Sequence, residues 1–322
     1  MKYAYLPSTG LQVSQICLGT MTFGGQTSAS DSEKIIAYAL DNGVNFIDTA
    51  NIYTKGESES IIGQSLGNRR KDVILATKTG GPTARIPNSS GLSRRQIVNS
   101  VEDSLKRLNP DYIDLLYLHF PDRNTPSEEY IDTATSLIRS GKLRYWGVSN
   151  FSAWQCCDIV HKAKQMNAIA PCVTENVYSL INRGIEDELV PFLHQFPMGL
   201  TAFNPLAGGL LTGKHNKEKY TQGTRFDLER GYAMRYWNDQ NFEAVEFLKK
   251  IARENDMTMV ELSYRWLLSQ PWVTSIICGV SKLEQLQENL NYCGEKTLPA
   301  DILEKCGKAW AMIHGSYFNY HR

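Results

Sequence analysis

Four side chains able to donate, accept or stabilise protons stand at or just after the ends of short apolar runs. They are Asp48, Tyr53, Lys78 and His119. Taken singly, each has an ordinary structural interpretation, since a strand-end Asp caps a turn, a Lys reaches solvent and a His is often a hydrogen-bonded core residue. Together they are residue types that general acid–base chemistry uses. That chemistry depends on whether the fold brings the ends of these runs to one place.

The elements that must position these side chains alternate regularly along the chain. Short runs rich in Ile, Leu and Val predict buried strands at residues 15–18, 45–47, 73–76, 115–118, 145–148, 172–174, 200–202 and 275–278. Helical periodicity occurs between them at residues 32–42, 58–66, 94–108, 127–139, 153–165 and 186–194. This alternation predicts an α/β protein, a closed parallel (β/α)8 barrel of the TIM type. Chemistry in such barrels lies at the carboxyl ends of the strands, so the four side chains are expected on one rim.

The predicted barrel carries additions near both ends of the chain. Residues 3–6 and 11–13, around a turn at 7–10, predict an N-terminal β-hairpin. Extra helices are expected near the C-terminus at 242–255 and 260–269, after a polar loop at about 215–240. We expect residues 1–322 to form a single domain with this long loop as an insertion, because barrels of this length fold as one unit.

Composition narrows the possible functions. The 322 residues include 34 basic and 34 acidic side chains, so no global charge favours nucleic acid or an anionic membrane. No apolar run is long enough to span a membrane, and the first residues lack the apolar segment of a secretory signal. Seven scattered cysteines suit a reducing cytoplasm, and nothing has the spacing of a metal site. We expect a cytoplasmic protein without metal, nucleic-acid or membrane partners, of unknown oligomeric state.

A glycine-rich segment follows the seventh predicted strand. Residues from Gly208 to Lys214 have the spacing of a P-loop, but His215 stands where the Mg²⁺-binding hydroxyl is needed. A nucleoside triphosphatase is therefore not expected, whereas phosphate binding is, because barrels commonly bind phosphate after this strand. No Gly-x-Gly-x-x-Gly segment follows a strand, which argues against a Rossmann nucleotide site.

The order and spacing of these motifs over residues 1–295 resemble the aldo-keto reductase family. They look closest to the branch that contains bacterial aldehyde reductases and potassium-channel β-subunits. The resemblance is carried by Gly19-Thr20-Met21, Asp48-Thr49-Ala50 with Tyr53, Lys78, Leu118-His119-Phe120-Pro121-Asp122, Gly147-Val148-Ser149-Asn150, the segment from Pro205 to Lys214, and Gly279-Val280-Ser281 with Gln285, Glu288 and Asn289.

The resemblance implies an NADPH-dependent oxidoreductase that reduces the carbonyl group of a small aldehyde or ketone. Tyr53 is then the proton donor, Lys78 lowers the pKa of Tyr53, Asp48 anchors Lys78 and His119 orients the carbonyl oxygen. The residues alone leave open an alternative in which Lys78 forms a Schiff base with substrate, as in barrel aldolases. That alternative explains neither Tyr53 nor the cofactor motifs.

The resemblance also implies a cofactor site around the rim. Its expected members are Gly19, Thr20, Met21, Asp48, Ser149, Asn150, Glu175, Phe203, Asn204, Pro205, Leu206, Gly208, Gly209, Lys214, Arg225, Gly279, Ser281, Lys282, Gln285, Glu288 and Asn289. Ser149 and Asn150 match the pair that holds the nicotinamide carboxamide. Glu175 replaces the usual glutamine there, and Phe203 replaces a tyrosine that stacks on the ring. The charge of Glu175, if retained, would favour the cationic oxidised ring and leaves the direction of the reaction open.

Two questions keep an alternative answer: whether the cofactor is NADPH or NADH, and whether the protein is an enzyme or a cofactor-binding regulator. Lys282 at a helix start is the first candidate for a 2′-phosphate, and Arg225 the second, so NADPH is favoured over NADH. The expected substrate pocket is apolar, lined by Met21, Phe23, Tyr53, His119 and Phe120. The competing function is an NADP-binding sensor or regulatory subunit with little turnover. The full set of acid–base residues, and a start without a long extension, favour the enzyme.

Overall fold

Eight parallel strands close into a barrel in the computed structural model, which describes residues 1–220, 222–228, 230–294 and 297–314. The strands are joined in the order β10-β3-β4-β5-β6-β7-β8-β9. Their bounds are β3 (Ile16–Gly19), β4 (Phe46–Asp48), β5 (Ile74–Thr79), β6 (Ile113–Leu118), β7 (Leu143–Ser149), β8 (Val173–Val177), β9 (Gly199–Phe203) and β10 (Ser275–Gly279). Every predicted strand is present, and the predicted (β/α)8 barrel is confirmed.

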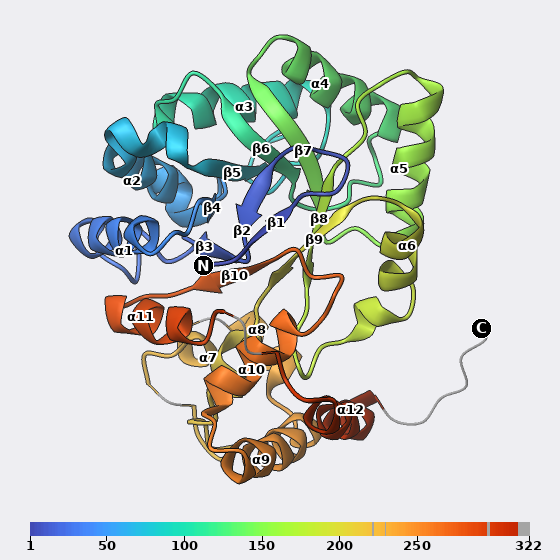
Figure 1. Cartoon of the computed structure of the whole chain (residues 1–322). Helices are drawn as coiled ribbons and strands as arrows, with labels where there is room; N and C mark the ends of the chain where they lie inside the picture. The colour runs from blue at the N-terminus through green and yellow to red at the C-terminus, as the bar shows by residue number, and fades with distance from the viewer. Residues whose placement is uncertain (221, 229, 295–296, 315–322) are drawn as a thin grey trace. The chain divides into compact units, whose positions relative to one another are not determined.

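Helices alternate with these strands and lie outside the barrel (Figure 1). They are α1 (Ala29–Asp41), α2 (Glu57–Leu66), α3 (Arg94–Leu108), α4 (Ser127–Arg139), α5 (Ala153–Gln165), α6 (Leu189–Gln195) and α11 (Leu283–Asn291). Side-chain caps fix where some of them begin. Ser93 accepts a hydrogen bond from the Gln96 amide at the start of α3, and Ser152 forms a capping box with Gln155 at the start of α5.

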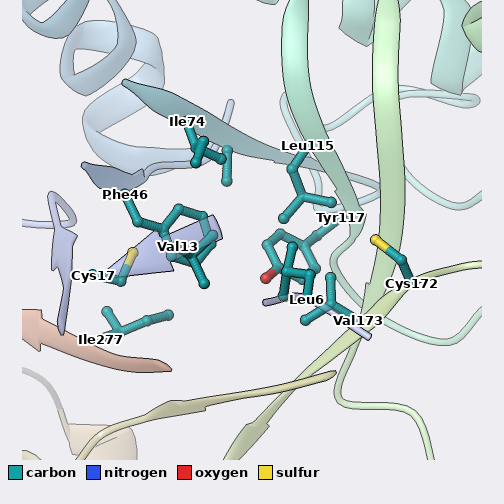
Figure 2. Packing of buried hydrophobic residues seen from close by; sticks show 11 residues of the cluster. Leu6, Val13, Cys17, Phe46, Ile74, Leu115, Tyr117, Cys172, Val173 and Ile277 are labelled. Carbon is teal, nitrogen blue, oxygen red and sulfur yellow. The ribbon is translucent and has the colours of Figure 1, made fainter. Parts of the chain in front are cut away.

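The predicted N-terminal hairpin is present as β1 (Tyr3–Tyr5) paired with β2 (Gln12–Ser14). Leu6 and Val13 of this segment are fully buried among side chains from the barrel strands, as Figure 2 shows. Several of their partners, including Phe46, Ile74 and Val173, are the first residues of their strands. The hairpin therefore packs against the amino ends of the strands, opposite the ends where barrel chemistry is expected.

The described residues divide into two compact units. Unit 1 contains the barrel and comprises residues 1–176, 185–203 and 272–290. Unit 2 draws on residues 177–184, 204–271 and 291–322, and its helices are α7 (Arg225–Leu228), α8 (Arg230–Tyr236), α9 (Asp239–Glu254), α10 (Met259–Leu268) and α12 (Ala300–His314). That the whole chain forms one domain stays a prediction. None of the described helices is long and apolar enough to cross a membrane.

Two parts of unit 2 differ from the sequence expectation. The predicted polar loop at about 215–240 contains the short helices α7 and α8. Helix α12 was not predicted, although Ile302, Cys306 and Ala309 are buried along one face of it. Their spacing of four and three residues is the helical signal that could have identified it.

Candidate active site

Lys78, near the end of β5, occupies the centre of a buried polar cluster. Its ammonium donates hydrogen bonds to both carboxylate oxygens of Asp48, at the end of β4, and to the Thr49 carbonyl oxygen at 3.1 Å. The register of the sheet places Asp48 beside Ala76, two residues before Lys78. The Lys78 side chain is fully buried. A charged lysine in this position requires such partners, because an unpaired buried charge is very costly.

The two carboxylates around Lys78 keep it protonated. Burial by itself lowers the pKa of Lys78, but the nearby Asp48 and Glu175 carboxylates outweigh burial and raise the pKa above its ordinary value. Burial also raises the pKa of Asp48, against the opposing influence of Lys78. An amine that forms a Schiff base needs its free-base form, which a lowered pKa supplies. The charge of Lys78 therefore argues against the aldolase alternative.

Tyr53 begins a short turn, η1 (Tyr53–Gly56), that follows β4. Its aromatic ring centre lies 5.3 Å from the Lys78 ammonium. Thr54 and Lys55 both have positive φ angles, of 46° and 59°, which is unusual for residues with a side chain. The Thr54 hydroxyl donates to the Phe23 carbonyl oxygen at 2.7 Å and accepts from the Ser58 amide, so the turn is held at its second residue, directly after Tyr53.

The pKa of Tyr53 differs from the sequence expectation. The sequence predicts that Lys78 lowers it toward neutral pH, and Lys78 does act in that direction. Burial acts most strongly in the other direction, Asp48 and Glu175 add to it, and the pKa lies above its ordinary value of 10.0. Tyr53 is nevertheless partly exposed to solvent. In this structure the phenol is thus an accessible, protonated group at neutral pH.

His119 follows β6 and lies beside Tyr53. The two ring centres are 6.1 Å apart in an edge-to-face arrangement, and the Phe120 ring stacks on His119 at 4.2 Å. Burial, with a smaller contribution from the Lys78 charge, lowers the pKa of His119 to about 3, so the imidazole is neutral at neutral pH. Its buried Nδ1 atom has no hydrogen-bond partner among the described residues. A neutral imidazole can donate one hydrogen bond to a substrate oxygen.

Glu175, on β8, belongs to the same cluster. Its carboxylate Oε2 lies 3.4 Å from the Lys78 ammonium, and its side chain is 5% exposed. Burial, followed by the nearby Asp48 charge, raises the pKa of Glu175 well above its ordinary range. The sequence analysis assigned Glu175 to the cofactor and missed its contact with Lys78. A glutamate ending an otherwise apolar buried run was the available signal.

The remaining unit 1 residues expected at the cofactor lie at neighbouring strand ends. Thr20 follows β3 and donates its hydroxyl to the Asp48 carbonyl oxygen, and Gly19 pairs in register with Gly279 of β10. Asn150 has a φ of 64° and donates its amide to the His119 carbonyl oxygen and the Ser149 hydroxyl. Met21 is exposed at the same edge and Phe203 is half-buried at the end of β9.

The segment after β10 combines exposed and buried positions. Lys282, Gln285 and Glu288 are exposed, and the Ser281 amide donates to the Gln285 side chain at 2.9 Å. Asn289 is buried instead, and its amide donates to the Cys278 sulfur. Loop residues Thr22 and Thr27 donate to the carbonyl oxygens of Val280 and Ser281, which joins the segment after β3 to the segment after β10.

The glycine-rich segment forms its own turn in unit 2. Asn204 accepts a hydrogen bond from the Gly208 amide at 2.7 Å, and Pro205 and Leu206 lead into η4 (Ala207–Thr212). Gly208 and Gly209 have φ angles of 70° and 106°, which glycine adopts without strain. Lys214 is exposed. Arg225 donates to the Tyr232 hydroxyl at 3.1 Å and lies over that ring.

The residues expected to line the substrate pocket differ in their exposure. Tyr53 is partly exposed, and Met21 and Phe120 are exposed at 40% and 42%. Phe23 is completely buried, because its segment turns back into the structure and its carbonyl oxygen accepts from Thr54. The Phe23 ring therefore packs in the interior and offers no surface to a substrate.

The cluster formed by Tyr53, Lys78, Asp48, His119 and Glu175 contains one group, the Tyr53 phenol, that can donate a proton to a bound molecule. An accessible phenol stands in front of a buried ammonium, beside a neutral imidazole with an unpaired nitrogen. The described residues contain no group of three or more His, Cys, Asp or Glu side chains placed to hold a metal ion. The chemistry of this donor set is general acid catalysis on a polar substrate oxygen.

Comparison with known proteins gives the relationships of the chain. Residues 15–311 match the model of the aldo/keto reductase family. A probable voltage-gated potassium channel subunit beta from Arabidopsis thaliana is 39% identical over 299 residues, covering 90% of each chain. The uncharacterized oxidoreductase YrpG of Bacillus subtilis (strain 168) is 36% identical, covering 94% of each chain. Aflatoxin B1 aldehyde reductase member 2 of Rattus norvegicus is 34% identical over 95% of this chain and 87% of its own.

Proposed function

The chain belongs to the aldo/keto reductase family and is an NAD(P)-dependent oxidoreductase, and on this premise we propose that it reduces aldehydes or ketones to alcohols with NADPH, using Tyr53 as the proton donor. The observation that carries this proposal is the accessible Tyr53 phenol, 5.3 Å by its ring centre from the buried Lys78 ammonium. The rat relative is named an aldehyde reductase, which supports a carbonyl substrate.

Each residue of the cluster has a distinct task in this proposal. Tyr53 gives its proton to the carbonyl oxygen as negative charge develops there, and Lys78 stabilises the phenolate that is left. Asp48 holds the Lys78 ammonium in place. His119 is neutral, so it can donate a hydrogen bond that orients the carbonyl without competing as a proton acid. The raised pKa of Tyr53 keeps the phenol protonated before reaction.

The polar groups at the strand ends fit a nicotinamide cofactor. When bound, NADPH supplies the hydride for the carbonyl carbon. Ser149, Asn150 and Glu175 would hold the carboxamide. The buried Oε2 atom of Glu175, which lies 3.4 Å from the Lys78 ammonium but accepts no hydrogen bond from the described residues, could accept one from the NH₂ group of the carboxamide. Gly279, Ser281, Gln285, Glu288 and Asn289 would bind the adenosine half. The turn from Asn204 to Lys214 would bind the pyrophosphate, since positive-φ glycines expose backbone amides there.

Tyr53→Phe tests the proton-donor role. The variant keeps the ring and loses only the hydroxyl, so carbonyl reduction should fall on the order of 10²–10⁴-fold. NADPH affinity, measured by fluorescence titration, should stay within a few-fold because the phenol contacts substrate. Reduction is followed by NADPH absorbance with a panel of aldehydes and ketones. Undiminished turnover in the variant would remove Tyr53 from the mechanism.

Lys282→Ala tests the preference for NADPH. Lys282 is exposed and directly precedes α11, whose first amides favour an anion such as a 2′-phosphate. Losing a charged contact of about 1–3 kcal/mol should weaken NADPH binding roughly 5- to 150-fold and leave NADH binding nearly unchanged. Arg225→Ala is the matched comparison. If only Arg225→Ala weakens NADPH binding, Arg225 is the residue that binds the 2′-phosphate. If Lys282→Ala weakens NADPH and NADH binding equally, Lys282 contributes to the binding of both cofactors and does not select for the 2′-phosphate.

A regulatory function is the second candidate, because the Arabidopsis relative is named a probable channel subunit. In that case the cofactor would act as a ligand and turnover would be slight. The same assay separates the two candidates. Tight NADPH binding with negligible reduction of every carbonyl compound, in wild type as in Tyr53→Phe, would favour the regulatory function.

A further inference from the structure

Glu175 is an ionisable group that the proton-transfer scheme does not use. It lies on β8 in register with Ser149 of β7, and its carboxylate Oε2 is 3.4 Å from the Lys78 ammonium. This oxygen is buried and has no hydrogen-bond partner among the described residues. The Lys78 ammonium, already bound to both Asp48 oxygens, is thus shared between two carboxyl groups.

The charges around Glu175 do not balance if every group is ionised in the usual way. The titratable side chains that surround it are Cys17 on β3, Asp48 on β4, Tyr53, Lys78 on β5, Tyr117 on β6 and His119, with Cys278 of β10 beyond Cys17. Lys78 is the cation of this group, since His119 is neutral and burial keeps the Cys17 thiol and the Tyr53 and Tyr117 phenols protonated. Two carboxylates against one ammonium would leave a surplus negative charge in a site shielded from water. Such a charge is costly unless one carboxyl group keeps its proton.

We propose that Glu175 is a second acidic partner of Lys78 that shares one buried proton with Asp48, and that it acts as a positioning residue keeping Tyr53 in its proton-donating form. The proton is held by one or the other of the two carboxyl groups, and no bond to any other atom forms or breaks. At neutral pH the Asp48–Glu175 pair carries one negative charge, which Lys78 balances. At higher pH the shared proton leaves, and the second carboxylate then opposes ionisation of Tyr53.

The consequence for catalysis rests on the proposed function. Reduction needs a phenol that gives a proton, whereas the reverse oxidation of an alcohol needs a phenolate that takes one. Above the pH at which the shared proton leaves, Glu175 adds its own negative charge beside Lys78 and disfavours the phenolate. Glu175 thereby biases the site toward reduction, whereas a neutral glutamine at the same position would leave Lys78 to stabilise the phenolate with Asp48 alone.

Glu175→Gln in the cofactor-free protein tests the shared proton directly. Infrared spectra at pH 7 should contain the carbonyl stretch of a buried protonated carboxyl group in wild type and lack it in the variant. Glu59→Gln is the matched control, because Glu59 is a fully buried glutamate in unit 1 that is ion-paired with Arg107. Its spectrum should keep the band. Identical spectra of wild type and Glu175→Gln from about pH 5 to pH 9, a range that spans the Glu175 pKa of about 8, would overturn the proposal. If Glu175→Gln does not fold, Glu175→Met replaces it, since apolar residues of similar volume are often tolerated in buried ionic sites.

The pH dependence of protein stability provides a second test of the shared proton. A carboxyl group with a raised pKa in the folded state holds a proton there that it loses in the unfolded chain, so its contribution falls as pH rises above the ordinary value of 4.5. The melting temperature of Glu175→Gln relative to wild type should therefore increase as pH rises from about 4.5. A constant difference across this range would count against the shared proton.

The catalytic consequence is read from the ratio of kcat for alcohol oxidation to kcat for carbonyl reduction, both measured at saturating substrate and at one pH above the point where the shared proton leaves. In Glu175→Gln this ratio should rise about tenfold, the effect of one pKa unit at Tyr53, and the pH profile of oxidation should move to lower pH. An unchanged ratio and profile would overturn the positioning role. If wild type turns over no carbonyl compound, the proposed function fails, while the infrared and stability measurements still decide the shared proton.

Discussion

At the scale of single residues, Lys78 determines the electrostatics of the site. Its buried ammonium faces Asp48, Glu175 and the Tyr53 ring, so its charge affects every other acid–base group in the cluster. Removing either partner of a buried ion pair leaves an uncompensated charge, which is strongly destabilising. Catalytic and structural effects of a Lys78 substitution must therefore be separated in the same experiment.

Lys78→Met should reduce carbonyl turnover about as much as Tyr53→Phe, on the order of 10²–10⁴-fold. Any residual activity should extend to higher pH, because Lys78 lowers the pKa of Tyr53 and its loss raises it. The double variant Asp48→Asn/Lys78→Met serves as the control, since it restores charge balance and should recover stability without recovering activity. A substrate adduct trapped on Lys78 by borohydride would instead support the Schiff-base alternative.

A second prediction for a single residue concerns His119 and the pH dependence of protein stability. Its pKa is lowered from 6.5 to about 3 by burial and by Lys78, so the unfolded chain binds more protons than the folded protein between these values. The neutral His119 therefore contributes stability above about pH 6.5 that is lost as pH falls toward 3. Melting temperatures of wild type should fall more steeply over this window than those of His119→Asn. Parallel curves would show that His119 ionises freely in the fold.

At the scale of elements, close packing between α2 and α3 supports the turn that holds Tyr53. Helix α2 directly follows η1, and a methyl group on Gly63 of α2 would come within 2.5 Å of the Leu108 carbonyl oxygen at the end of α3. Nearby, the buried Glu59 carboxylate accepts from Arg107 of α3 and from Thr77, the neighbour of Lys78 on β5. These contacts tie the turn to the strand that carries the lysine.

Gly63→Ala should lower the free energy of unfolding by about 1–3 kcal/mol, because the added methyl group meets backbone atoms that cannot move aside easily. Helix propensity alone predicts the opposite sign, a gain of up to about 1 kcal/mol. Gly307→Ala in α12 is the matched control, since a methyl group there meets no atom within 4 Å. It should stabilise by about 0.5–1 kcal/mol. Chemical denaturation of both variants checks the contrast, and stabilisation by Gly63→Ala would contradict it.

At the scale of the whole molecule, stability and chemistry are concentrated at opposite ends of the barrel. The hairpin residues Leu6 and Val13 pack against the amino ends of the strands (Figure 2). Asp48 and Lys78 stand at or near the carboxyl ends of their strands, and His119 directly follows β6. A substitution in the hairpin contact therefore lowers stability without touching the catalytic cluster.

Leu6→Ala should cost about 2–5 kcal/mol of stability, the usual range for truncating a fully buried leucine. Below the melting temperature, kcat and KM should remain within about twofold of wild type, since changes at distant, independent sites usually act separately. Calorimetry and steady-state kinetics on the same preparation provide both values. A tenfold loss of kcat in fully folded protein would show that the hairpin is coupled to the site.

The sequence by itself determined the strands, most helices and the positions at which polar residues interrupt them. Parallel strands that are buried on both faces are apolar along most of their length, so Asp48, Lys78 and His119 are conspicuous at run ends. The same local information identified the hairpin, because the chemistry of its turn defines it.

Only the tertiary structure determined which of these ionisable groups lie close enough to shift one another's pKa. Glu175 lies 97 positions after Lys78 in the chain, and closure of the barrel brings its carboxylate to the ammonium. The pKa of Tyr53 likewise depends on burial and on two carboxylates from other strands, which a pairwise argument with Lys78 could not include. Phe23 and Asn289 became buried for the same reason, since burial is a property of the packed molecule and pKa shifts follow from it.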